Sequence, residues 1–330
     1  MYNEEKILQE KFILLLKEKI PHHLANTLME ILPLEKEAIY RRLRGEVSFS
    51  FIEMAKLSTR LGISLDHIAN IVSPYRSQWY HLHIRDYCEL KPIDLNMSYN
   101  YIKAINIAAE DPDSEFGIAA NMLPLHIGLL HLPLYRVYLL KWRYQFGNTS
   151  KNKLNYSEIQ VPEAEKETYQ QYLYAVKKIK HTFFIWDQSF FISLINDINY
   201  FYNIRCISQE EMYMLKQEMR LLLDTLERYA DDGKFETGNK LETYVSNLNF
   251  ETTYTYLSSN NVSISMHSTY NLGAFTSLEK DACNETKNWI QGLKKSSSLI
   301  SGAAQRDKII FFEKQRKILD KYFILNENER

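Results

Sequence analysis

Apolar residues recur every three or four positions along most of the chain, which is the spacing of amphipathic helices. In the first 70 residues this pattern is interrupted at Pro21, Pro33, Gly45 and Gly62. The pattern predicts five helices, over residues 4–19, 24–32, 35–44 and 51–61 and after Ser64, which can cap the last one. Five short helices make a compact N-terminal domain, which we place at residues 1–72.

The rest of the chain predicts a larger, mostly helical region over residues 97–330, after a linker over 73–96. Helices are expected near 97–108, 122–146, 163–180, 185–202, 209–230, 276–293 and 305–323. β-favouring residues at 252–256 and 262–266 flank a polar turn and predict a small antiparallel hairpin within 250–270. The expected fold class is therefore mainly α, with one small β-hairpin near 250–270.

The predicted helix over 209–230 carries a heptad-like seam of apolar side chains. Its members are Met212, Leu215, Met219, Leu222, Leu226 and Tyr229. Such a seam either pairs two chains as a coiled coil or packs the helix into the core of one chain. For a run this short, core packing is the more frequent outcome, and a dimer contact remains the alternative.

Composition favours helices and a reducing compartment. The chain has only ten glycines and eight prolines in 330 residues, and residues that break helices are thus few. Its three cysteines, Cys88, Cys206 and Cys283, are far apart and odd in number, as expected for free thiols. Polar and proline residues interrupt the apolar stretch 118–140, and the N-terminus is acidic. We therefore expect no membrane span, no signal peptide and a cytoplasmic location.

Three segments of the N-terminal domain resemble a known family. They are 28–32, 38–46 and 55–66, with one helix closing at Arg44-Gly45 and the next followed by Gly62-Ile63-Ser64-Leu65-Asp66. These segments are similar to the Cro/XRE branch of lambda-repressor-like helix-turn-helix domains, over about the first fifth of the chain. In that branch the third helix lies in the major groove of DNA.

The resemblance assigns DNA-binding roles to the third helix. Carried over by position, the residues facing the groove are Glu35, Lys36, Glu37, Tyr40 and Arg41. Arg41, Lys36 and Tyr40 would read bases, while Arg42 and Arg44 would hold phosphates. The chain departs from the family pattern at Leu24-Ala25-Asn26, where a Gln or Ser is usual, at Pro33, which replaces a turn glycine, and at Arg42, whose position is normally apolar.

The charge of the domain limits how it can bind DNA. Residues 1–72 contain ten basic and ten acidic residues, and the whole chain has a net charge of −1. Because phosphate contacts supply most non-specific affinity, a neutral monomer binds DNA weakly, and we expect a homodimer formed through the rest of the chain. A basic face made by Lys36, Arg41, Arg42, Arg44 and Lys56 would favour DNA, whereas a mixed face would favour a protein-docking module on a helical scaffold.

The whole chain also resembles a group of large bacterial helix-turn-helix regulators. The shared segments are 40–46, Tyr-Arg-Arg-Leu-Arg-Gly-Glu, and 297–301, Ser-Ser-Leu-Ile-Ser. This resemblance implies a transcription factor that binds double-stranded DNA. We expect the C-terminal region to form the dimer and to offer a site for an effector, either a small molecule or a protein. The resemblance implies no particular ligand and no cofactor.

Motifs for catalysis are absent from the sequence. It contains no Gly-x-Gly-x-x-Gly, Walker-type or Gly-x-Ser-x-Gly segment. His81, His83 and Cys88 form the one tight cluster of metal-type ligands, but no second pair lies at a zinc-finger spacing. His126 and His131 lie in an apolar stretch, where histidines satisfied within the core are expected. We therefore expect neither an enzyme nor a metal site.

Overall fold

The computed structural model describes residues 2–61, 63, 65–70, 79–83, 92–124, 127, 130–147, 154–188, 190–269, 272–302 and 305–323. These residues form two compact units, Met1–Trp79 and Tyr80–Arg330. Each unit has its own hydrophobic core.

The N-terminal unit consists of five helices whose bounds lie within two residues of the predicted ones. They are α1 (Tyr2–Lys19), α2 (Leu24–Ile31), α3 (Lys36–Leu43), α4 (Phe51–Leu61) and α5 (Leu65–Asn70). Fully buried side chains from four of these helices, including Phe12, Leu28, Ile39 and Leu57, form its core. After α3, Gly45 takes a φ of 75°, a left-handed conformation that suits glycine and ends the helix.

The C-terminal unit contains an eight-stranded mixed sheet, and the expectation of a mainly α region with one small hairpin is therefore wrong. The strands are β1 (His81–His83), β2 (Glu115–Ala120), β3 (His181–Trp186), β4 (Lys240–Ser246), β5 (Tyr254–Ser258), β6 (Ser263–Thr269), β7 (Gly273–Ser277) and β8 (Ser297–Leu299). Their order is β1-β7-β6-β5-β2-β3-β4-β8, in which β2, β3 and β4 are parallel and the other pairings are antiparallel.

The predicted hairpin is one part of this sheet. Strands β5 and β6 pair antiparallel across the turn at 259–262, close to the expected positions. Strand β1 lies in the stretch 73–96 that we expected to be a linker, and it pairs with β7. The segment 297–299, in the stretch that resembles the large regulators, forms the edge strand β8 against β4.

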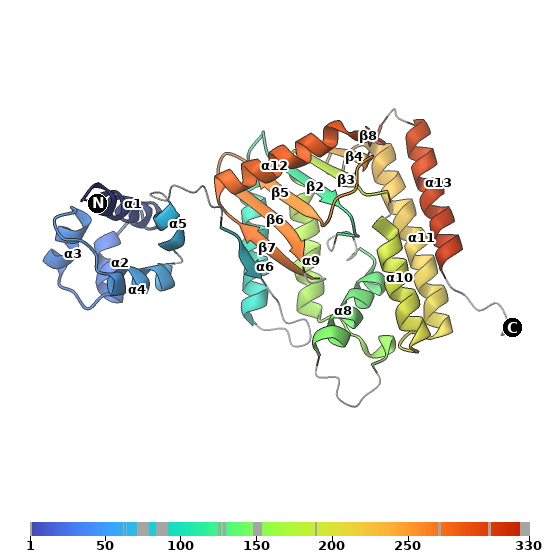
Figure 1. The fold of residues 1–330 in the computed structure, drawn as a ribbon, viewed down its shortest axis with the longest axis horizontal. Coiled ribbons are helices and arrows are strands. Elements are labelled where there is room, and N and C mark those ends of the chain that lie inside the picture. Colours follow the sequence, from blue (N-terminus) through green and yellow to red (C-terminus); the bar gives the residue numbers. More distant parts are fainter. Residues whose placement is uncertain are drawn as a thin grey trace. The chain divides into compact units, whose positions relative to one another are not determined.

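Helices surround the sheet unequally. They are α6 (Pro92–Ala109), α8 (Leu132–Phe146), α9 (Glu163–Val176), α10 (Phe190–Asn203), α11 (Gln209–Asp232), α12 (Lys280–Lys295) and α13 (Gln305–Tyr322), with a short 3₁₀ turn at Tyr156–Glu158. Helix α12 covers one face, and the other six form the layer against the opposite face, where the large core lies (Figure 1).

Side chains along the central strands alternate between the two faces of the sheet. Phe116 and Ile118 of β2 point into the large core, whereas Ala119 packs in the smaller core under α12. Gly117 also faces α12, and a methyl group at this position would lie 2.5 Å from the Tyr256 ring and 2.6 Å from the Phe183 ring. Glycine is therefore required where these two buried aromatic rings approach the strand.

A polar network fastens α12 to the sheet. Glu115 on β2 accepts hydrogen bonds from Tyr256 and from Lys287, 3.0 Å away on α12, and His181 lies 3.1 Å from its carboxylate. Glu242 on β4 lies 3.0 Å from the other ring nitrogen of His181 and accepts a hydrogen bond from Lys294 at 2.9 Å. Burial opposes ionisation of both carboxyl groups, but these donors, together with Lys240 at 2.7 Å from Glu242, outweigh it and hold the pKa of each at about 2.

The seam of the long helix α11 is core. Met212, Leu215, Met219 and Leu222 are fully buried within the chain and belong to the large core. The more frequent of the two expected outcomes, packing within one chain, is therefore confirmed. No helix in the part of the chain described here is both long and apolar enough to cross a membrane.

Candidate functional site

Six of the seven residues assigned to DNA contact are exposed at α3 and its two ends. They are Glu35, Lys36, Glu37, Tyr40, Arg41 and Arg44. Glu35 takes an extended conformation as the N-cap of α3, and Ile39, on the opposite side, is fully buried. This burial fixes the rotation of the helix, so that residues 36, 37, 40, 41 and 44 share an outward face.

The exposed face of α3 carries both signs of charge. Arg44 pairs with Glu46 at 2.6 Å and with Glu37 at 3.0 Å, and Arg41 lies 3.6 Å from Glu46. The hydrogen bond from Arg44 lowers the pKa of Glu46. Lys36 forms no ion pair with any residue that the structure describes. The face is thus mixed, with Lys36 and two arginines that share two glutamates.

Arg42 is not part of this face. Its guanidinium donates two hydrogen bonds, each 3.0 Å long, to the carboxylate of Glu53 on α4 and a third to the Ala38 carbonyl at 3.1 Å. Both side chains of this ion pair are only 15% exposed. The resemblance assigned Arg42 to a phosphate, but its partners here are internal, and it joins α3 to α4 at a position that is apolar in the family pattern.

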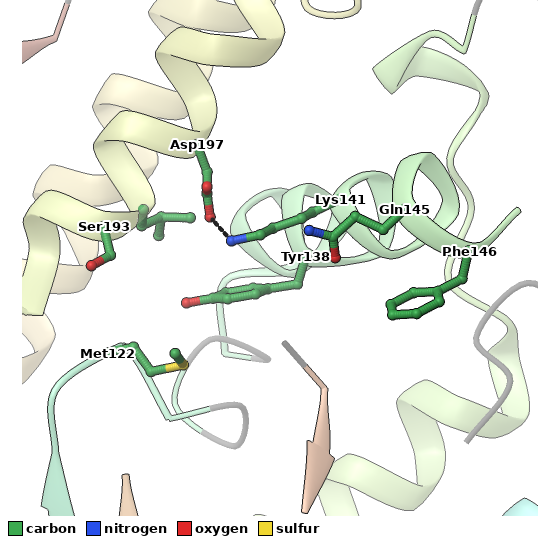
Figure 2. Close-up of a pocket in the computed structure, with 8 residues that line it drawn as sticks. Met122, Tyr138, Lys141, Gln145, Phe146, Ser193 and Asp197 are labelled. Atoms are coloured by element: carbon green, nitrogen blue, oxygen red, sulfur yellow. Dashed lines mark hydrogen bonds and ion pairs between the residues drawn. The ribbon is translucent and has the colours of Figure 1, made fainter. Parts of the chain in front are cut away.

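The C-terminal unit contains a cavity of about 340 Å³ between α8 and α10. Figure 2 shows Tyr138, Lys141, Gln145 and Phe146 extending from α8, with Ser193 and Asp197 on the facing helix α10. Met122, two residues beyond the end of β2, and Leu194 complete the lining. Tyr138, Lys141 and Gln145 stand three and four positions apart, which places them along one side of the helix.

Two opposite charges meet in the wall of this cavity. Lys141 Nζ donates to Asp197 Oδ2 at 2.7 Å, with the two side chains 29% and 26% exposed (Figure 2). Burial raises the pKa of Asp197, and Lys141 offsets this only in part. The Tyr138 hydroxyl donates to the Leu123 carbonyl at 3.4 Å, and burial raises its pKa, so that this phenol is neutral.

Sequence reasoning assigned no role to any of these cavity residues. A signal was present in Lys141, a charged residue in the middle of the apolar helix Leu132–Phe146. Its partner Asp197 is 56 positions away, and nothing in the sequence connects the two. The cavity exists only because α8 and α10 pack beside each other.

The histidine and cysteine candidates lie only partly within the described residues. No group of three or more potential ligands able to hold a metal ion occurs among the residues that the structure describes. His81 lies in β1, whereas Cys88 and His126 fall outside the described residues. His131 is 7% exposed and lies 2.6 Å from Glu218, so that it is a core histidine with a partner, as expected.

Comparisons with models of protein families, with curated proteins and with solved structures found no significant match to this chain.

Proposed function

We propose that the chain is a sequence-specific DNA-binding transcriptional regulator that inserts α3 into the major groove and acts as a homodimer. The observation that carries this proposal is the outward face of α3. Ile39 and the Arg42–Glu53 pair hold the helix so that Lys36 stands exposed in its first turn and Tyr40 and Arg41 stand exposed in its second half. A recognition helix contacts base edges with its N-terminal residues, and these side-chain types donate well to guanine and phosphate.

The glutamates on this face do not prevent DNA binding. The ion pairs of Arg41 and Arg44 are exposed, with arginine side chains 55% and 48% accessible. Exposed ion pairs contribute about 0–1 kcal/mol, whereas several phosphates act together on a docked protein. We therefore expect phosphate groups to displace Glu37 and Glu46 from Arg44 when DNA is bound.

The mixed charge of the face supports a second candidate. A docking module that binds another protein, on a scaffold formed by the C-terminal unit, would use acidic and basic side chains side by side. In that case the pairs Arg44–Glu37 and Arg41–Glu46 would exchange for pairs with the partner. Binding to DNA separates the two candidates directly.

The test is selection of the purified full-length protein against a random double-stranded DNA library at two salt concentrations. Enrichment of a palindromic motif with half-sites about 34 Å apart supports the proposal. A library that shows no enrichment at either salt concentration argues for the docking module, and pull-down of partners through the same face is then the next experiment.

The roles of two arginines are tested on the selected site. Arg41→Ala should lower affinity and relax base preference at one position, because Arg41 is assigned to base readout. Arg44→Ala should weaken all sequences alike, by about tenfold, because it is assigned to a phosphate. Lys103→Ala, at an exposed site on α6, is the control and should bind as the unmodified protein does. If both arginine variants lost the same affinity for every DNA sequence, the assignment of roles would be contradicted.

A further inference from the structure

The cavity between α8 and α10 lies where open α/β sheets commonly hold ligands. Met122 follows the carboxyl end of β2, and α10 begins shortly after the carboxyl end of the parallel neighbour β3. Ligands in such sheets bind outside the carboxyl ends of the strands. The volume of about 340 Å³ lies at the lower end of the range for small-molecule sites, about 300–1,000 Å³, and suits a molecule of metabolite size.

The two opposite charges in the cavity wall determine which kind of ligand the cavity can bind. Lys141 and Asp197 neutralise each other at 2.7 Å while both are partly buried. A ligand with only an anionic group would engage Lys141 and leave the Asp197 carboxylate without a counter-charge, which is costly at a partly buried site. A ligand with only a cationic group would pair with Asp197 and leave the Lys141 ammonium group without a counter-charge. A molecule with an adjacent carboxylate and ammonium group pairs with both and leaves no charge uncompensated.

The remaining lining is apolar and aromatic. Tyr138 and Phe146 present rings, and Met122 and Leu194 add a thioether and an aliphatic chain. Ser193 and Gln145 form no side-chain hydrogen bond with the described part of the chain and stand at the exposed rim. Burying an apolar group of a ligand against such a wall stabilises the complex, whereas a polar side chain would lose its hydration there.

We infer that this cavity binds a free α-amino acid with a large apolar or aromatic side chain. Its carboxylate pairs with Lys141, its ammonium group pairs with Asp197, and its side chain packs among Tyr138, Phe146 and Met122. This inference goes beyond the proposed function and does not depend on it, because the site lies wholly within the C-terminal unit and its test contains no DNA.

The experiment is isothermal titration calorimetry of the full-length protein with L-phenylalanine, L-tyrosine and L-leucine. Two analogues, 3-phenylpropionate and phenethylamine, each keep the ring and one of the two charged groups. We expect saturable binding of at least one amino acid, and binding of each analogue weaker by about tenfold or more, because one charge-assisted pair is missing. A Kd above about 1 mM for all three amino acids, or equal binding of 3-phenylpropionate, would overturn the inference.

Variants locate the site. Ser193→Phe places a ring at the exposed rim and should abolish binding by filling the cavity, and Lys141→Met should weaken it by about tenfold or more. Lys216→Met is the matched control, because Lys216 forms a similar pair with Asp320, at 3.2 Å, between α11 and α13. Circular dichroism verifies that each variant is folded. Unchanged binding by folded Ser193→Phe would place the ligand elsewhere and overturn the inference.

Discussion

At the scale of single residues, two glutamates compete with phosphate for the arginines at α3. Glu46 contacts both Arg41 and Arg44, and Glu37 contacts Arg44 again. In the proposed DNA complex, Arg44 contacts a phosphate, so that a phosphate and a glutamate would compete for the same donors. The sequence showed that both signs of charge are present, but only the structure shows which residues pair.

Removing the charge of Glu46 should strengthen DNA binding. In Glu46→Gln both arginines lose an acidic neighbour, and repulsion between this carboxylate and phosphate disappears. We expect affinity for the selected site to rise by up to about fivefold, which corresponds to the loss of one exposed, unfavourable charge contact of about 1 kcal/mol. Fluorescence anisotropy with a labelled duplex measures this change. Weaker binding of the glutamine variant would indicate that Glu46 itself contacts DNA.

At the scale of elements, one ion pair joins α3 to α4. Arg42 and Glu53 are mutually satisfied at 3.0 Å and only 15% exposed. Burial opposes ionisation of Glu53, but hydrogen bonds from Arg42 and Ser50 lower its pKa nevertheless. The orientation of the proposed recognition helix therefore depends on this pair as well as on the buried Ile39.

Breaking this pair on one side should destabilise the N-terminal unit. Arg42→Leu or Glu53→Leu alone leaves one partly buried charge without its partner, and each should lower the free energy of unfolding by about 1–3 kcal/mol. The double variant removes both charges and should recover most of the loss, because two apolar side chains can pack together. Urea denaturation of the three variants measures this. Additive losses in the double variant would show that the pair is not coupled.

The network under α12 predicts an acid-sensitive element. Glu115 and Glu242 have a pKa of about 2 in the folded chain against an ordinary value of 4.5. Because these pKa values are lowered by folding, their stabilisation is complete above about pH 4.5 and is lost as the pH falls from 4.5 towards 2. The urea concentration needed to unfold the C-terminal unit should therefore decrease as the pH is lowered from 4.5 towards 2.

Matched variants test the source of this acid sensitivity. Glu115→Gln should lower the free energy of unfolding at pH 7 by about 2 kcal/mol and make its dependence on pH below 4.5 shallower. Glu163→Gln, whose carboxylate is exposed and pairs with Lys166, is the control and should keep the original dependence. An unchanged slope in Glu115→Gln would assign the acid sensitivity to other carboxylates.

At the scale of the whole molecule, charge limits the proposed DNA complex. The chain has a net charge of −1, so that the global field does not attract DNA. The cations exposed on α3 are Lys36, Arg41 and Arg44, since Arg42 is bound internally. Binding must then rest on a few local contacts from two copies of the chain, which is why the proposal requires a homodimer.

This small number of cations predicts a moderate dependence on salt. Six exposed cations in a dimer give a slope of log K against log salt concentration no steeper than about −5. Arg44→Ala, which removes one phosphate contact from each copy, should make the slope shallower by about 2. Titrations at several salt concentrations measure the slope. A much steeper value would mean that a basic surface outside α3 also binds DNA.

The sequence alone determined the five helices of the N-terminal unit and the positions of most helices in the C-terminal one. Local signals sufficed there, because apolar spacing and breakers such as Gly45 act within a few residues. The hairpin of β5 and β6 was visible for the same reason. Of the assigned contact residues, all but Arg42 lie exposed at α3, as its periodicity predicts.

Only the tertiary structure decided the rest. Strands β2 and β3 have five of six residues buried, and a short apolar run that is buried on both faces cannot be distinguished from a buried helix by its period. We therefore expected a helix from residue 185, where β3 is ending. The Arg42–Glu53 pair and the cavity that Lys141 and Asp197 line depend on contacts between separate helices. Such contacts depend on how the helices pack, and they produce no periodic pattern in the sequence.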